Sequence, residues 1–259
     1  MERHILMKDK VVVVTGASSG IGKACALKFA LDGANVAAIG RNGEALEALR
    51  NDSSANSGII SIYTADLSET EQIERVASEI VSDYGRIDTL VNAAGIIGNG
   101  TIESTSAEEF DAMMHINLRQ VFLLTQICTP YLIQAKGSIV NVSSVAGTRA
   151  FPNLLAYCVS KAAVDQFTRC VSLDLAEKGV RVNAVNPGVV ISNLHRRGGM
   201  EQAAYENFLE HSKATHPLGR VGTPEEVAGL IHFLASDQAG WITGATYNID
   251  GGRAETCAR

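Results

Sequence analysis

Paired cysteines and metal-spaced histidines are missing from this chain. Its five cysteines are scattered and never form a CxxC pair, and its six histidines show no HxH or HExxH spacing. These patterns argue against a disulfide framework, a zinc site or any other metal centre, and they favour a reducing compartment. Cys158 follows Tyr157 directly, and we interpret it as a small packed thiol, with a reactive thiol as the alternative.

Long apolar runs and an excess of basic charge are also missing. The valine run Val11–Val14 has strand length, far below the ~20 residues that a membrane span needs. The first ten residues are too few and too polar for a secretory signal. The net charge is −6, with both signs interleaved along the chain. We therefore expect a cytoplasmic protein with neither a membrane nor a nucleic acid as its partner.

Short β-branched runs alternate with longer helical stretches along the 259 residues. This order predicts βαβ units, and many of the runs lack polar alternation, as buried parallel strands do. We expect one α/β domain over 1–259: a doubly wound parallel sheet (Rossmann fold) of seven strands with helices on both faces. The expected strands are Val11–Thr15, Val36–Gly40, Ile59–Thr64, Thr89–Asn92, Ser138–Ser143, Arg181–Asn186 and Ala245–Ile249. The expected helices are Gly20–Asp32, Gly43–Asn51, Glu69–Tyr84, Ala107–Gln134, Ala156–Lys178 and Pro224–Leu234.

The stretch Ser192–Pro217 interrupts this alternation. It holds the basic run His195–Arg197, two glycines and a helix-like stretch, Glu201–Lys213. An insertion between a strand and the next regular helix is a candidate lid over a ligand. Arg196, Arg197 and Lys213 would suit an acidic or phosphopantetheine-bearing substrate, and a solvated face is the alternative.

A glycine-rich turn follows the first strand. The residues Thr15–Gly22 read TGASSGIG and lead into a helical stretch. A helix N-terminus after such a turn binds anions, because free backbone N–H groups and the helix dipole point at the ligand. Gly16 permits the tight turn, Gly20 permits close approach of a pyrophosphate, and Gly22 permits close packing of the helix. A plain tight turn is the alternative.

Tyr157 and Lys161 stand four residues apart in a helical stretch, so their side chains share one face. A phenol with a pKa near ~10 is a poor acid or base at neutral pH, and a nearby ammonium lowers that pKa. A tyrosine that exchanges a proton near neutrality is what carbonyl reduction or alcohol oxidation requires. The alternative is a pair on a solvated helix face.

The turn and the YxxxK pair together resemble the classical short-chain dehydrogenase/reductase family, over about Lys10 to Arg253. Within that family the chain looks most like the 3-oxoacyl-carrier-protein reductase type. The resemblance implies an NAD(P)-dependent oxidoreductase acting on a carbonyl or a secondary alcohol. Asp250–Gly252 matches the family's C-terminal signature.

Further motifs of the family imply cofactor contacts. The stretch that packs beside the cofactor corresponds to Asn92, Ala93, Ala94 and Gly95. Asp66, followed by Leu67, resembles the acid that reaches the adenine, although Glu69 three residues on also allows Asp66 to be a helix N-cap. Asn92 has a plain turn residue as its alternative. The stretch that closes over the nicotinamide corresponds to Asn186–Ser192 with Pro187, Gly188 and Val190, and it has Ser192 where threonine is more usual. Ser18, Ser19 and Ile21 complete the phosphate turn.

The same resemblance assigns the catalytic residues. Ser144 precedes Tyr157 by thirteen residues, as the family serine does, and Ser143 is the competing choice. Asn117 matches the asparagine that holds a helix kink and a proton-relay water, with an ordinary polar helix residue as the alternative. In reduction, Ser144 and Tyr157 would bind the carbonyl oxygen and Tyr157 would give its proton. Lys161 would lower the pKa of Tyr157 and reach the nicotinamide ribose.

The end of the second strand favours NADP, as NADPH in reduction, over NAD. The residues there read Ala38-Ile39-Gly40-Arg41-Asn42, with no acid to repel a 2′-phosphate and with Arg41 to accept it. A solvated charge is the alternative for Arg41.

We expect a ketone or a 3-oxoacyl thioester as the small-molecule substrate, and a homotetramer or homodimer built on Ala107–Gln134, Ala156–Lys178 and the last strand. The alternatives are a cofactor-sensing protein without turnover, an NAD-dependent alcohol or hydroxysteroid-type dehydrogenase, and an epimerase or dehydratase acting on a nucleotide-sugar.

Overall fold

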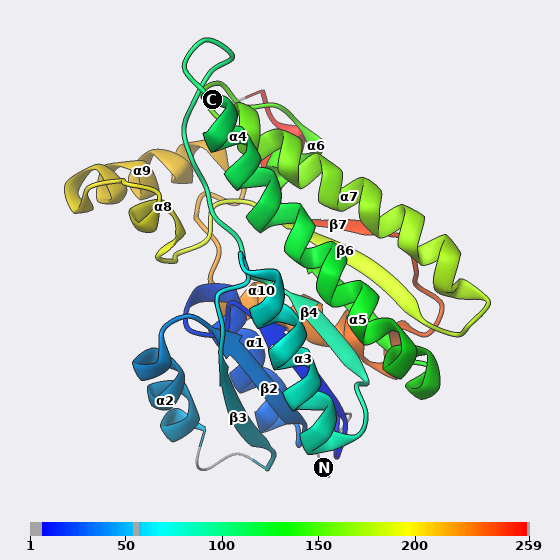
Figure 1. Ribbon diagram of the computed structural model, residues 1–259. Helices are drawn as coiled ribbons and strands as arrows, with labels where there is room; N and C mark the ends of the chain where they lie inside the picture. Colours follow the sequence, from blue (N-terminus) through cyan, green and yellow to red (C-terminus); the bar gives the residue numbers. More distant parts are fainter. Residues whose placement is uncertain (1–6, 54–56, 258–259) are drawn as a thin grey trace.

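A computed structural model describes residues 7–53 and 57–257. Its centre is one parallel sheet of seven strands in the order β3-β2-β1-β4-β5-β6-β7 (Figure 1). The strands are β1 Val11–Thr15, β2 Asn35–Gly40, β3 Ile59–Thr64, β4 Thr89–Asn92, β5 Ser138–Val142, β6 Arg181–Pro187 and β7 Thr246–Ile249. The predicted single α/β domain with a doubly wound sheet is confirmed, with strand bounds within one residue of those expected.

Helices connect the strands and cover the sheet. Their bounds are α1 Gly20–Leu31, α2 Gly43–Asp52, α3 Thr70–Tyr84, α4 Ala107–Met114, α5 Gln120–Ala135, α6 Val145–Thr148, α7 Leu155–Ala176, α8 Leu194–Arg197, α9 Gln202–Thr215 and α10 Pro224–Ala235. Two single turns of 3-10 helix span Asp237–Ala239 and Arg253–Glu255. Within the described ranges, no helix has both the length and the apolar character needed to cross a bilayer.

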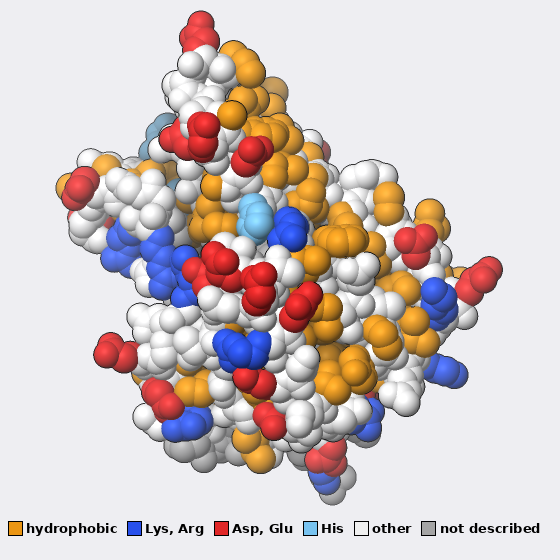
Figure 2. Space-filling view, viewed as in Figure 1, with side chains coloured by type: hydrophobic (Ala, Val, Ile, Leu, Met, Phe, Trp, Pro, Cys, Tyr) orange, Lys and Arg blue, Asp and Glu red, His pale blue; other side chains and the backbone are white. Residues whose placement is uncertain are grey.

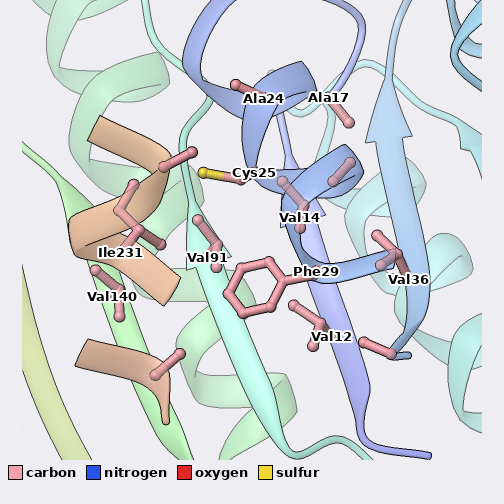
Figure 3. Close-up of a cluster of buried hydrophobic side chains, with 14 of the residues drawn as sticks. Val12, Val14, Ala17, Ala24, Cys25, Phe29, Val36, Val91, Val140 and Ile231 are labelled. Atoms are coloured by element: carbon pink, nitrogen blue, oxygen red, sulfur yellow. The ribbon is translucent and has the colours of Figure 1, made fainter. Parts of the chain in front are cut away.

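Alternate residues of β1 pack into two separate cores, one on each face of the sheet. Val12 and Val14 of β1 pack with α1, α2 and α10, around the fully buried Phe29 (Figure 3). Val13, between them, packs on the opposite face with α3, α5 and α7. Because side chains alternate across a strand, an unbroken valine run supplies both faces of the sheet.

The expected helix Ala107–Gln134 is wrong as one continuous element. It is divided into α4 and α5 by a π-helical turn over His115–Arg119. Ser106 begins α4 with a capping box, in which its hydroxyl accepts from Glu109 N and the Glu109 carboxylate accepts from Ser106 N. A π turn contains one residue more than an α turn needs, and such turns are frequent at functional sites.

The strand order reverses between β1 and β4, and this opens a crevice at the carboxyl edge of the sheet. The Thr15 hydroxyl, at the end of β1, accepts hydrogen bonds from the backbone N–H groups of Ala93 and Ala94, each at 3.0 Å. The helices α8 and α9 project beside this edge (Figure 1). The fold therefore gathers the ends of β1, β4, β5 and β6 around one site.

Candidate active site

A cleft of about 1260 Å³ lies at the carboxyl edge of the sheet. It brings together most of the residues predicted for the cofactor and for catalysis, whereas Asn92 and Asn117 do not line it. The predicted residues that line it are Gly16, Ser18, Ser19, Gly20, Ile21, Gly22, Arg41, Asn42, Asp66, Leu67, Ala93, Ala94, Gly95, Ser144, Tyr157, Lys161, Pro187, Gly188, Val190 and Ser192.

The glycine-rich turn forms a cradle that side chains would fill. A Cβ on Gly16 would lie 2.9 Å from Ala94 Cα, and a Cβ on Gly22 would lie 2.4 Å from Gly16 O. Ser19 is the N-cap of α1, yet its side chain makes no capping hydrogen bond. The first turn of α1 therefore presents its N–H groups to the cleft, which fits the pyrophosphate of a dinucleotide.

The adenine end of the cleft contains one ion pair. Arg41 Nη1 lies 3.8 Å from Asp66 Oδ2, and both side chains are exposed to solvent. The alternative interpretation of Asp66, as a helix N-cap, is wrong. Glu69 is the N-cap of α3, and Asp66 Oδ1 instead accepts from the N–H and hydroxyl of Ser68, because the chain turns there before the helix begins.

Burial raises the pKa of Asp66, but the hydrogen bonds from Ser68 and the charge of Arg41 outweigh burial and hold that pKa below its usual value. Asn42, next to Arg41, is the N-cap of α2 and accepts from Ala45 N at 2.9 Å. The two neighbours therefore divide their roles: Asn42 begins a helix, and Arg41 extends into solvent at the rim.

Asn92 and Asn117 are buried behind the cleft wall. Asn92 Nδ2 donates to Asn141 Oδ1 at 2.9 Å and so joins β4 to β5. Asn117, in the π-helical turn, accepts from Ile96 N at 2.9 Å and donates to Ile96 O at 3.0 Å and to Ser160 Oγ at 2.9 Å. Asn117 thus ties the helix break to the segment after β4 and to the helix of Tyr157.

Ser144 and Tyr157 meet where β5 ends beside α7. The Ser144 hydroxyl caps the short helix α6 by accepting from Ala146 N at 3.1 Å. Ser143, the competing candidate, donates its hydroxyl to Lys161 O at 3.0 Å. Burial raises the pKa of Tyr157 to about 12, and the hydrogen bond with Ser144 opposes that rise. In the free chain, burial is the largest effect on the pKa of Tyr157.

Lys161 lies at the same depth as Tyr157. Its Nζ donates to Val142 O at 2.9 Å and lies 5.8 Å from the centre of the Tyr157 ring. Burial lowers the pKa of Lys161 to about 8, against the opposing charge of Asp165 one helical turn on. Asp165 is only 2% exposed, and its Oδ2 accepts from Asn186 Nδ2 at 2.8 Å. The charge of the buried Asp165 carboxylate therefore favours the protonated form of Lys161.

Sequence reasoning missed the residue that supports the Pro187–Gly188 stretch. His216 Nδ1 lies 2.6 Å from Ser212 O, and Nε2 accepts from Val189 N at 3.1 Å. A Cβ on Gly188 would lie 2.8 Å from that Nε2 atom, so the glycine is required for this contact. Ser192, at the end of the stretch, exchanges backbone hydrogen bonds with the Tyr205 hydroxyl of α9.

The apolar part of the substrate half was also missed. Tyr157 belongs there to the same packed cluster as Ile97, Phe151 and Leu154. Cys158 is half-buried in that cluster, as expected of a packed thiol. A signal was available, because the twelve residues between Ser144 and Tyr157 must border the site that these two residues share.

Together, the glycine cradle, the buried Tyr157–Lys161 pair and the crevice at the strand reversal define a dinucleotide-binding oxidoreductase site. The family profile described as enoyl-(acyl carrier protein) reductase matches residues 16–254. The chain is 41% identical to the 3-oxoacyl-(acyl-carrier-protein) reductase FabG of Thermotoga maritima, over 95% of this chain and 98% of that protein. It is 36% identical to a D-threitol dehydrogenase of Mycolicibacterium smegmatis, over 95% and 93%.

A solved structure with its cofactor, a short-chain dehydrogenase/reductase of unknown function from Caenorhabditis elegans, is similar with a TM-score of 0.91 and 35% identity, over 96% of this chain and 97% of that one. The chain belongs to the short-chain dehydrogenase/reductase family. It is an oxidoreductase that acts on CH–OH groups or the corresponding carbonyls with NAD(P). The substrates named for its relatives differ, from 3-oxoacyl groups to a sugar alcohol.

Proposed function

We propose that this enzyme is an NADP(H)-dependent reductase of a ketone or a 3-oxoacyl thioester. The observation that carries the proposal is that Ser144, Tyr157 and Lys161 line one cleft with the glycine cradle. When bound, the nicotinamide supplies a hydride to the carbonyl carbon or accepts one from the alcohol carbon. In the direction of reduction, one proton and one hydride convert the carbonyl to the alcohol.

The residues have distinct tasks in this mechanism. The Ser144 and Tyr157 hydroxyls hydrogen-bond the carbonyl oxygen, and Tyr157 donates its proton as negative charge develops on that oxygen. Burial keeps Tyr157 protonated at neutral pH, and the positive charge of Lys161 favours release of that proton as the carbonyl oxygen gains negative charge. The Lys161 ammonium stabilises the phenolate that is left and binds the nicotinamide ribose. The water relay at Asn117 stays a prediction. Both polar atoms of the Asn117 side chain already make hydrogen bonds, to Ile96 and to Ser160.

The preference for NADP rests on Arg41. Its side chain is 61% exposed at the adenine rim, and no acid stands at the end of β2. A guanidinium in that place binds a 2′-phosphate, and an acid there binds a 2′-hydroxyl instead. Asp66 is the nearby carboxylate, and its pairing with Arg41 offsets the repulsion that it would exert on a phosphate.

Turnover with a panel of ketones, 3-oxoacyl thioesters and secondary alcohols, each assayed with NADPH and with NADH, tests the proposal. We expect kcat/KM to favour NADPH, and Arg41→Ala to lower the value for NADPH about tenfold while the value for NADH stays the same. Lys23→Ala removes a charge from α1 that pairs with Asp52 and lies outside the cleft, so it serves as the control. A preference for NADH in the wild type would refute the role of Arg41.

We also propose a homo-oligomer, most simply a tetramer, assembled through α4, α5 and α7. Phe122 of α5 is 45% exposed and packs edge-on against Phe167 of α7, with ring centres 6.4 Å apart. A second apolar area contains Leu173, 79% exposed, and the fully exposed Trp241 before β7. Light scattering of the wild type and of Phe122→Asp tests the face that contains Phe122 and Phe167. A monomeric wild type would refute the proposed homo-oligomer.

A further inference from the structure

The basic residues of the segment Ser192–Pro217 fall into two groups. Arg196 is anchored by hydrogen bonds to Asn193 and Gln202, and it lies 5.3 Å from the centre of the Tyr205 ring. Lys213 pairs with Glu210. Arg197 alone of the three lines the cleft, and its guanidinium has no hydrogen bond or ion pair among the described residues. Lys and Arg side chains gather around α8 on the face shown in Figure 2.

His195 lines the cleft beside Arg197 and has an unused ring nitrogen. Its ring packs on Phe208, with centres 4.6 Å apart. Its Nδ1 atom is buried and has no hydrogen-bond partner within the described part of the chain. Burial lowers the pKa of His195, so the ring is neutral at neutral pH. Buried polar atoms are rarely left without a partner, so Nδ1 is available for a hydrogen bond in a side chain that also lines the cleft.

A further cation lines the cleft near Phe151. Arg253 is 8% exposed, lines the cleft, and lies 5.1 Å from the centre of the Phe151 ring. Among the described residues that line the cleft, Asp66 is the one carboxylate, and it lies at the adenine end beside Arg41. The substrate half therefore carries positive charge although the whole chain has a net charge of −6.

An apolar surface separates these cations from the reacting group. The backbone of Gly198 packs against Ile97, because a Cβ on Gly198 would lie 2.9 Å from Ile97 Cγ2. Ile97 belongs to the cluster that contains Tyr157 and Leu154. Arg197, next to Gly198, thus borders the apolar wall that extends to the catalytic tyrosine.

We propose that the substrate carries an anionic group, a carboxylate or a phosphate, joined through an extended chain to the carbonyl that Tyr157 protonates. Arg197 and His195 bind that group. The inference rests on the proposed function and names its substrate class, because the cofactor phosphates are taken by the glycine cradle and Arg41. A free oxo acid and a phosphopantetheine thioester both have this chemistry.

Matched substrate pairs test the inference with NADPH at a fixed concentration. One pair is a medium-chain oxo acid and its methyl ester, and the other is the 4′-phosphopantetheine and pantetheine thioesters of one 3-oxoacyl group. We expect the wild type to prefer the charged member of one pair. Arg197→Gln should lower kcat/KM for that member about tenfold, mainly through KM, and leave the neutral member unchanged.

Lys213→Gln removes the same charge from α9 outside the cleft and should keep the preference, which separates a local contact from the general field. A preference in the first pair identifies a carboxylate, and one in the second identifies a phosphate. Equal kcat/KM for charged and neutral members in both pairs would overturn the inference, whereas the proposed function would still hold. Failure to oxidise NADPH with any member would overturn both.

Discussion

The buried carboxylate of Asp165 sets the pH range in which Lys161 keeps its charge. Burial lowers the pKa of Lys161 to about 8, and the Asp165 charge opposes this effect. Asp165→Asn removes the charge and preserves the shape and the acceptor for Asn186 Nδ2. Because an anion favours the ammonium, we expect its removal to lower the pKa of Lys161 further.

The size of the shift follows from the separation along the helix. Two unit charges one helical turn apart, at about 6 Å and an effective dielectric constant of about 20, interact by roughly 2.8 kcal/mol, or about 2 pH units. Solvent relaxation reduces this, so we expect a shift of about one to two units. With a shift of one unit, the protonated fraction of Lys161 at pH 8 falls from about one half to about one eleventh, roughly fivefold.

The measurement is the pH profile of kcat/KM for NADPH between pH 6 and about 9.5, which reports groups of the free enzyme. We expect the wild type to lose activity above a pKa near 8, as Lys161 loses its proton. In Asp165→Asn the falling limb should move to lower pH, and the values below the limb should change little.

Asp174→Asn is the matched control, because Asp174 is an exposed carboxylate on the same helix. An unchanged limb in Asp165→Asn would refute the electrostatic coupling. So would an equal shift in Asp174→Asn, because it would show that the general field of the helix is responsible.

Three further predictions concern the proposed acid Tyr157, the glycine cradle and the hydrogen bonds between Arg181 and the end of α10. Tyr157→Phe should lower kcat/KM for reduction by roughly 100- to 10,000-fold and keep the Kd for NADPH, measured by turnover and fluorescence; retained turnover would contradict the mechanism. Gly22→Ala places a Cβ 2.4 Å from Gly16 O and should cost about 1–3 kcal/mol in urea unfolding, whereas Gly229→Ala, with open space around it, should not destabilise. Arg181→Met removes three hydrogen bonds to carbonyls at the end of α10 and should destabilise by about 2–4 kcal/mol with normal turnover per folded molecule; unchanged stability would show that water replaces them.

Features that depend on neighbours in the sequence were predictable. The unbroken valine run Val11–Val14 indicates a strand buried on both faces, and the glycine spacing after it indicates a turn too tight for side chains. The four-residue step from Tyr157 to Lys161 places both side chains on one helix face whatever the rest of the fold does. These local rules led to the sheet and to the two ends of the cleft.

Features that depend on contacts between distant segments were not predictable. Arg196 and Arg197 are adjacent and chemically identical, and only the folded segment shows that one is anchored and the other lines the cleft. The spacing of Asp66 and Glu69 fits a capping box. In the structure, the Asp66 carboxylate instead accepts hydrogen bonds from Ser68. The Tyr157 pKa follows burial, which no spacing in the sequence reports.

The π-helical turn at His115–Arg119 makes the enzyme sensitive to a change in length at that place. A π turn holds its extra residue while the helices on either side stay almost in the phase of one continuous helix, so deleting that residue would keep the present faces of α4 and α5. The change would fall on Asn117, which makes its hydrogen bonds to Ile96 and Ser160 from within the turn. None of these three residues belongs to the glycine-rich turn after β1. A single-codon deletion should therefore spare the nucleotide cradle and disturb the segment after β4 and the helix of Tyr157, giving a protein that binds its nucleotide and turns over poorly.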